Sequence, residues 1–150
     1  MTQSYRTILV AVDGSSGAEL ALHKAIHVAK RNQARLIICH VIDTRALHNV
    51  IAFDASIYET LEKEAELLLE DYFERATEAG LTNVQTLIEF GNPKTLLSQD
   101  IPKETGADLM LLGATGLNAF ERLLIGSSSE YILRHADIDL LIVRDGQKSL

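Results

Sequence analysis

The stretch that decides the fold is residues 8–13, "ILVAVD", a short apolar run that ends in an aspartate. Four runs of the same kind follow it: 35–41 "RLIICHV", 84–90 "VQTLIEF", 108–113 "DLMLLG" and 139–144 "DLLIVR". Most are continuously apolar instead of alternating, which is typical of strands that are covered on both faces. The sequence therefore predicts five short strands, most of them buried.

The intervals between these runs show the three-to-four spacing of apolar residues that is typical of amphipathic helices. We expect helices at 16–31, 56–79, 94–104 and 128–135. The second of them ends before Gly80, a favoured residue just beyond a helix. The third is expected despite Pro102 near its end.

Strands that alternate with helices imply a parallel sheet with right-handed crossovers. The fold class is therefore α/β, a three-layer α/β/α sandwich, and a chain of 150 residues fits one domain spanning 1–150. No internal repeat, low-complexity tract or linker divides it. One irregular segment, 43–55, is long for a strand-to-helix connection and either folds over a ligand or is a plain loop.

Composition narrows the class of protein. No run approaches the roughly 18–20 apolar residues of a membrane span, so no membrane partner is expected. The formal net charge of −7 opposes attraction to nucleic acid or anionic lipid, so no nucleic-acid partner is expected either. The start, "MTQSYRTILVAVD", has no leader-like pattern, which favours a cytoplasmic protein. The single cysteine, Cys39, is expected to be a buried core residue.

The position of a ligand site follows from the expected sheet. In an open parallel sheet, ligands bind beyond the carboxyl ends of the strands, where the strand order reverses. Asp13 ends the first run and Gly113 ends the fourth. If the strands have the order 3-2-1-4-5, these two ends adjoin at the point of reversal. We therefore expect a binding site between Asp13 and Gly113.

The stretch 113–128, "GATGLNAFERLLIGSS", begins at this point. Its three glycines allow a close approach of the backbone to a ligand, and its serines open a helix whose first N–H groups bind anions well. The alternative is a capping box, S-x-x-E, formed by Ser127 and Glu130, which needs no ligand. From the residues alone, both interpretations remain open.

The spacing Gly113-x2-Gly116-x9-Gly126-Ser127 resembles the nucleotide-binding signature of the ATP-binding branch of the universal stress protein family. The surrounding segments "ILVAVDGS", "CHV", "FGNP" and "GSSSEYILRHA…LLIVR" are also similar to that family, so the resemblance covers nearly the whole chain. It implies an adenine nucleotide alpha-hydrolase-like fold, with a five-stranded parallel sheet of order 3-2-1-4-5 and about four helices. One departure is "DID" at 137–139, where many relatives carry Cys-Pro.

The resemblance implies roles for the glycines and serines of the motif. Gly113 would lie against the ribose, and Gly116 and Gly126 against the phosphates. Ser127 and Ser128 would donate hydrogen bonds to the phosphates. The family usually also dimerises in antiparallel fashion through the last strand, 139–144, which has no proline to protect it as a sheet edge. We therefore expect a homodimer with Ile142 and Val143 near its seam.

Other residues at the strand ends complete the expected site. Val41 is matched in relatives by a residue whose backbone contacts adenine, and Ala11 and Val12 would supply apolar walls. Asp13 would repel a triphosphate unless it accepts ribose hydroxyls or holds a cation, so we assign it to ribose first and to a metal second. Alternatively, Asp13 is an acid at a helix start that Ser15 or Ser16 caps.

Candidates for catalysis are weaker. His23 and His27 have a spacing that can hold a metal, but no third ligand accompanies them, so we interpret them as a surface pair. His40, within an apolar strand, is expected to be a core histidine with a satisfied hydrogen bond. The serines at 127–129 lack a G-x-S-x-G elbow. No catalytic residue is predicted, and no metal ligand set is assigned.

Three hypotheses follow. The first is a stress-response protein whose regulatory ligand is ATP, or ADP or AMP, bound together with Mg²⁺ or Mn²⁺. Such a protein would hydrolyse the nucleotide slowly at most. The second is an enzyme, a hydrolase or transferase acting on an adenine nucleotide with a metal near Asp13. The third is a dimeric interaction module without a nucleotide.

Overall fold

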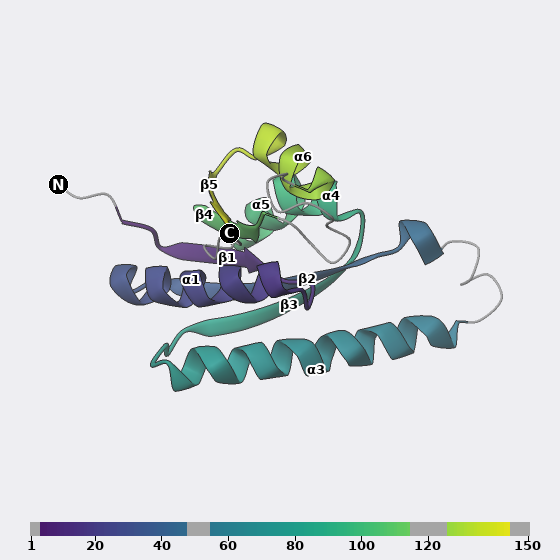
Figure 1. Cartoon of the computed structure of the whole chain (residues 1–150), viewed down its shortest axis with the longest axis horizontal. Helices are drawn as coiled ribbons and strands as arrows, with labels where there is room; N and C mark the ends of the chain where they lie inside the picture. Colours follow the sequence, from purple (N-terminus) through teal and green to yellow (C-terminus); the bar gives the residue numbers. More distant parts are fainter. Residues whose placement is uncertain (1–3, 48–54, 115–125, 145–150) are drawn as a thin grey trace, which may run out of the picture.

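The computed structural model describes residues 4–47, 55–114 and 126–144. Its five strands form one parallel sheet of order β3-β2-β1-β4-β5, the order that the sequence predicted (Figure 1). The strands are β1 (Thr7–Ala11), β2 (Arg35–Asp43), β3 (Val84–Gly91), β4 (Leu109–Gly113) and β5 (Asp139–Val143). The order reverses beside β1, which pairs with β2 on one side and with β4 on the other.

Helical segments fill the four predicted intervals. They are α1 (Ser16–Asn32), α3 (Ser56–Glu78), the series α4 (Pro93–Thr95), η2 (Leu96–Asp100) and α5 (Ile101–Thr105), and α6 (Ser127–His135). A further short 3-10 turn, η1 (Arg45–Leu47), follows β2. The ends of α1, α3 and α6 agree with the predicted ends to within a residue or so.

The predicted helix at 94–104 is interrupted by a π-helical turn at η2. Pro102 has no N–H to donate to the carbonyl four residues before it, and its ring crowds that carbonyl. The chain widens just before the proline, where the Ile101 N–H donates to the Leu96 carbonyl, a bond spanning five residues. Pro102 therefore changes the kind of helix without ending the helical segment.

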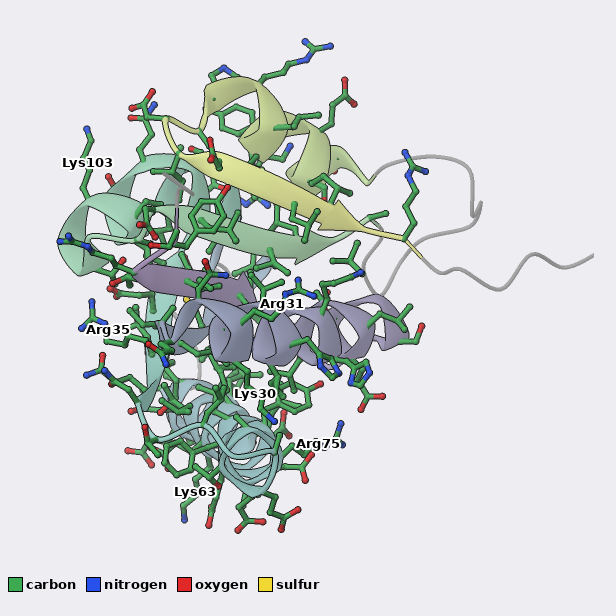
Figure 2. All side chains as sticks on the ribbon, turned by 90° about the vertical axis from the view of Figure 1, so that its left-hand side faces the viewer. Lys30, Arg31, Arg35, Lys63, Arg75 and Lys103 are labelled. Carbon is green, nitrogen blue, oxygen red and sulfur yellow. The ribbon has the colours of Figure 1, made fainter. Side chains whose placement is uncertain are left out.

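The layers follow from the alternation of side chains along the strands. Ile8 and Val10 of β1 face a core cluster covered by α1 and α3, whereas Leu9 faces a second cluster covered by α5 and α6. Figure 1 shows α3 along the bottom of the view and α4, α5 and α6 grouped at the top, with α1 drawn across the strands between them. In Figure 2, turned by 90° about the vertical axis, α1 and α3 lie below β1, and α6 lies at the top above β5. The three-layer sandwich is therefore confirmed.

Two other expectations from the sequence are met. Cys39 is buried, and burial raises the pKa of its thiol to about 12, so it is a core residue. His23 and His27 are an exposed pair with ring centroids 4.7 Å apart. No group of three metal-ligating side chains occurs in the described ranges. None of the helices described is long and apolar enough to cross a membrane.

Candidate functional site

A cavity of about 810 Å³ opens at the carboxyl ends of β1, β2 and β4, where the strand order reverses. Its volume lies within the usual range for small-molecule sites. The cavity is lined by all but one of the residues that the sequence proposed for nucleotide binding, namely Ala11, Val12, Asp13, Val41, Gly113, Gly126, Ser127 and Ser128. The remaining one, Gly116, lies outside the described residues.

The start of α1 fixes the Asp13 carboxylate. The Ser15 N–H donates to Asp13 Oδ1 over 3.0 Å, and the buried Ser15 hydroxyl in turn accepts from the Ala18 N–H over 3.1 Å. Ser15 is therefore the helix cap, one of the two caps that the sequence allowed. Asp13 lies at a helix start and also lines the cavity, so the two interpretations of this residue are compatible.

The end of β1 is held by two consecutive residues of β2. The Val12 N–H donates to the Cys39 carbonyl over 2.8 Å, and His40 Nδ1 lies 2.7 Å from the Val12 carbonyl oxygen. A carbonyl can only accept, so Nδ1 carries the proton of this bond. His40 has the satisfied hydrogen bond that was expected, but it is only half-buried and lines the cavity.

Strand β2 extends past the end of β1. Pairing with β1 stops at Ala11 and Cys39, whereas pairing with β3 continues to Asp43 and Gly91. The Cys39 carbonyl points toward β1, and main-chain groups two residues apart in a strand point the same way. The N–H and C=O of Val41 are therefore directed to the β1 side, beyond the last pair of that ladder.

The start of α6 differs from the capping box that the sequence left open as an alternative. Its N-cap residue is Gly126, with φ −61° and ψ 158° and no side-chain cap, so Ser127 is the first helical residue. The Glu130 N–H donates to the Gly126 carbonyl over 2.9 Å, and the Glu130 carboxylate pairs with Arg134 at 3.0 Å. The capping-box alternative therefore does not hold, because the cap falls one residue earlier, at Gly126.

An uncapped helix start leaves N–H groups for a ligand. Within the described residues, the N–H groups of Ser127 and Ser128 have no hydrogen-bond partner. Both residues line the cavity, at the positive end of the helix dipole. The start of α6 therefore suits an anion.

Two hydrogen bonds hold α6 to the end of β4. The Gly126 N–H donates to the Ala114 carbonyl over 2.8 Å, and the Ser129 hydroxyl donates to the Gly113 carbonyl over 2.9 Å. Sequence reasoning grouped Ser129 with the other serines and gave it no role of its own. The sequence gives little sign of this structural role, because the carbonyl that accepts from the Ser129 hydroxyl lies 16 residues away along the chain.

Gly113 has a packing role. A Cβ added at this position would lie 2.8 Å from both the carbonyl carbon and the oxygen of Gly17, closer than real Cβ atoms come to other heavy atoms. The first turn of α1 therefore packs directly on the end of β4. This contact requires a glycine whether or not a ribose also lies there.

The remaining walls are apolar and acidic. Helix α3 contributes Leu61, Ala65 and Leu68, and the other face contributes Leu97 and Ile132. None of these was predicted, because helical periodicity shows which side of a helix is buried but not which of its turns reaches the strand ends.

Two further carboxylates, Asp43 and Glu64, line the cavity. Asp43 is paired with Arg45 at 2.7 Å, and this side-chain hydrogen bond lowers the pKa of the Asp43 carboxyl. Burial, which raises that pKa, only partly opposes the effect. The cavity thus has one carboxylate at the end of β2 and one on α3, and an electropositive helix start beside the end of β4.

These features define an α/β protein with a small-molecule cavity at the reversal point of a parallel sheet. Residues 4–144 match the universal stress protein family, and the chain belongs to that family.

Three relatives illustrate the match. The chain is 48% identical, over 141 residues, to a protein of Staphylococcus haemolyticus assigned to the universal stress proteins; the match covers 94% of this chain and 86% of the relative. It superposes on the universal stress protein UspA from Lactobacillus plantarum with a TM-score of 0.83, at 29% identity and 95% and 100% coverage of the two chains. A universal stress protein solved in complex with cAMP gives 0.69, at 28% identity and 95% and 98% coverage.

Proposed function

We propose that this protein binds ATP as a regulatory ligand in the cytoplasm and hydrolyses it slowly at most. The observation that carries the proposal is the uncapped start of α6, which faces the same cavity as the Asp13 carboxylate. The relative solved in complex with cAMP supports an adenine nucleotide as the ligand class.

The adenine would lie beside Val41. The N–H and C=O of this residue point past the end of β1, and they form an adjacent donor and acceptor. The adenine edge offers one acceptor and one donor in the complementary arrangement. Ala11 and Val12 would flank the ring as apolar walls. Recognition of this kind needs no polar side chain at position 41.

The ribose and phosphates would extend from there toward α6. Asp13 Oδ1 is engaged by the Ser15 N–H, which orients the carboxylate so that its other oxygen can accept a ribose hydroxyl. The phosphates would accept hydrogen bonds from the N–H and hydroxyl groups of Ser127 and Ser128, next to Gly126. We propose Gly113 and Gly116 as the remaining contacts of the motif.

A divalent cation fits this arrangement in one way. Mg²⁺ is usually held by one or two carboxylates together with substrate phosphates and water, and Mn²⁺ prefers the same oxygen ligands. Asp13 is the carboxylate at the reversal point, and no group of three ligating side chains occurs in the part of the chain described. The cation would therefore enter with the nucleotide, and the charge that it supplies would offset the repulsion between Asp13 and the phosphates.

Regulatory binding is favoured over catalysis by the groups that the cavity presents. His40 uses Nδ1 to hold the Val12 carbonyl, and the Ser129 hydroxyl is donated to Gly113. Cys39 has a raised pKa and does not line the cavity. Among the described lining residues, we identify no nucleophile next to a general base.

Calorimetry with ATP and Mg²⁺ tests the proposal, with Ser128→Asp as the informative variant. An acid in the first turn of α6 stabilises the helix but repels phosphates. We expect binding at least tenfold weaker, the effect of about 1.4 kcal/mol, with no loss of thermal stability. Thr82→Asp adds the same charge on the exposed loop before β3 and should bind normally. Equal binding by both variants would refute the phosphate assignment.

Two further outcomes would each favour one of the other two functions. An absence of heat with ATP, ADP and AMP would favour a nucleotide-free interaction module. If the protein, purified to homogeneity, still releases phosphate from ATP over many turnovers, an enzyme would be favoured.

We also propose a homodimer formed by antiparallel pairing of residues 139–144. Strand β5 is an edge of the sheet, since it pairs only with β4 among the described strands. Val143 is buried against the core of its own chain, so its main chain and not its side chain would lie at the seam. Leu141 is 36% exposed and is the side chain best placed for perturbation.

Leu141→Lys should weaken such a dimer without unfolding the protomer, because it places like charges near the two-fold axis. Analytical ultracentrifugation at micromolar concentration would measure the change. A wild-type protein that sediments as a monomer would contradict the proposal, as would a Leu141→Lys dimer of unchanged affinity.

A further inference from the structure

His40 is a cavity residue to which neither the family match nor the nucleotide motif assigns a role. We infer that His40 is a positioning residue: by holding the Val12 carbonyl it sets the direction of the Asp13 carboxylate, and through it the preference for a ligand with free ribose hydroxyls. This inference rests on the proposed nucleotide site, and it also makes a prediction for the protein without nucleotide.

The first step is the short hydrogen bond itself. His40 Nδ1 donates to the Val12 carbonyl over 2.7 Å, and the Val12 N–H is taken by the Cys39 carbonyl over 2.8 Å. Val12 lies one residue beyond the end of β1 and would otherwise be held on one side only. Both polar groups of this residue are thus fixed by β2, one through its main chain and one through a side chain.

The second step is the rigidity of the peptide unit. The Val12 carbonyl and the Asp13 N–H belong to the same planar group, so fixing the carbonyl also fixes the plane from which the Asp13 side chain projects. The chain turns immediately afterwards at Gly14, where φ is +84°. Without a donor on the Val12 carbonyl, the plane could rotate about the Val12 Cα–C and Asp13 N–Cα bonds, and the permissive Gly14 would let the following chain adjust.

The third step is the link from Asp13 to the start of α1. Asp13 Oδ1 accepts from the Ser15 N–H over 3.0 Å, and Ser15 caps α1. These bonds restrain one carboxylate oxygen of Asp13, a residue that lines the cavity. A rotation of the Val12–Asp13 peptide would strain the Ser15 bond and turn the free oxygen away from the ribose position.

The choice of residue type supports this role. Position 40 lies in a strand whose preceding four residues are buried and apolar, so burial alone would favour another apolar side chain. An apolar side chain there would leave the Val12 carbonyl without its donor. A histidine supplies the donor with one ring nitrogen while its ring still packs against the cavity wall.

The test compares ATP with 2′,3′-dideoxy-ATP, which lacks both ribose hydroxyls. In the wild type we expect the dideoxy nucleotide to bind about tenfold or more weakly, as expected for loss of a hydrogen bond to a charged acceptor. In His40→Leu the ratio of the ATP affinity to the dideoxy-ATP affinity should fall below about threefold, mainly because ATP binds more weakly. His40→Asn, whose amide N–H can replace Nδ1 as the donor, should recover much of the ratio.

His135→Leu is the matched control. His135 also engages a main-chain carbonyl through Nδ1, that of Tyr131 at 2.9 Å, but it lies at the exposed end of α6 and does not line the cavity. This variant should keep the wild-type ratio. If His40→Leu weakens both nucleotides equally, or if it keeps the wild-type ratio, the inference is wrong.

A measurement without ligand separates this inference from the proposed function. Amide hydrogen exchange at Ser15 reports the bond to Asp13 Oδ1; exchange should accelerate in His40→Leu and return toward the wild-type rate in His40→Asn. If the wild type binds no nucleotide, the proposed function fails while this exchange pattern still tests the positioning of Asp13. Unchanged exchange in His40→Leu would overturn the positioning role whatever the nucleotide result.

Discussion

Replacing Gly113 by alanine tests whether this glycine serves the packing of the fold or a ligand. The backbone at Gly113 is not in the left-handed region, so alanine is conformationally acceptable there. Without a steric obstacle, Gly→Ala would stabilise the protein by about 0.4–1 kcal/mol, because it restricts the unfolded chain. The structure predicts the opposite sign.

The magnitude follows from the contact with α1. The new Cβ would lie 2.8 Å from the carbonyl carbon and oxygen of Gly17, and 3.2 Å from its Cα. All three are backbone atoms, so no side chain can rotate away, and the first turn of α1 must move by several tenths of an ångström. Overpacking of this kind costs about 1–3 kcal/mol. We therefore expect Gly113→Ala to lower the free energy of unfolding by about that amount.

Urea denaturation followed by far-UV circular dichroism measures the difference. The midpoint should fall while the slope with denaturant stays constant, as for a change in stability alone. Calorimetry on the folded variant then shows how much nucleotide affinity is lost in addition. A variant as stable as the wild type, or more stable, would refute the packing argument and leave ligand contact as the reason for the glycine.

Two more predictions concern charge. Helix α3 carries a row of glutamates four residues apart on its surface, at positions 62, 66, 70, 74 and 78, and Figure 2 shows Lys63 projecting outward from the same helix. Glu70→Lys replaces two repulsive pairs by two attractive ones and should stabilise the protein by about 1 kcal/mol at low salt. Glu70→Gln should give about half of this stabilisation, because it only removes the repulsion. If either variant keeps its gain in stability in 1 M salt, the origin of that gain is not electrostatic. For Cys39, burial raises the thiol pKa to about 12 in the folded state, so stability should fall as the pH rises from the ordinary thiol pKa toward that value. Urea midpoints measured from about pH 8 to 11 should therefore decline less steeply in Cys39→Ala than in the wild type, and parallel declines would count against this assignment.

The fold was predictable because its signals are local and repeated. Each apolar run became a strand, whereas the reversal beside β1 was predicted from the resemblance to a known family and not from the strands alone. The helix start at Ser16 was predicted because its cap, Ser15, bonds a neighbour three residues away. Such contacts are encoded within one turn of chain.

The start of α6 was harder to predict because its cap depends on a distant contact. The pattern at Ser127 and Glu130 satisfied the rule for a capping box, yet the bond between Gly126 and Ala114 sets the chain so that Gly126 takes the cap position. The role of His40 was equally hidden, since it depends on where β1 ends relative to β2. The sequence identified the polar residue but not its partner.

The unequal lengths of β1 and β2 have a consequence for how this chain can change. β2 stays paired with β3 through Asp43, whereas its pairing with β1 stops at Cys39. The open donor and acceptor at Val41 belong to the main chain, so they are the same for nearly any side chain placed there. Substitutions at this position can accumulate without altering the hydrogen-bonding pattern that the site presents. An insertion that lengthened β1 by two residues would remove this site, because the added residues would pair with the N–H and C=O of Val41 in the β1–β2 ladder.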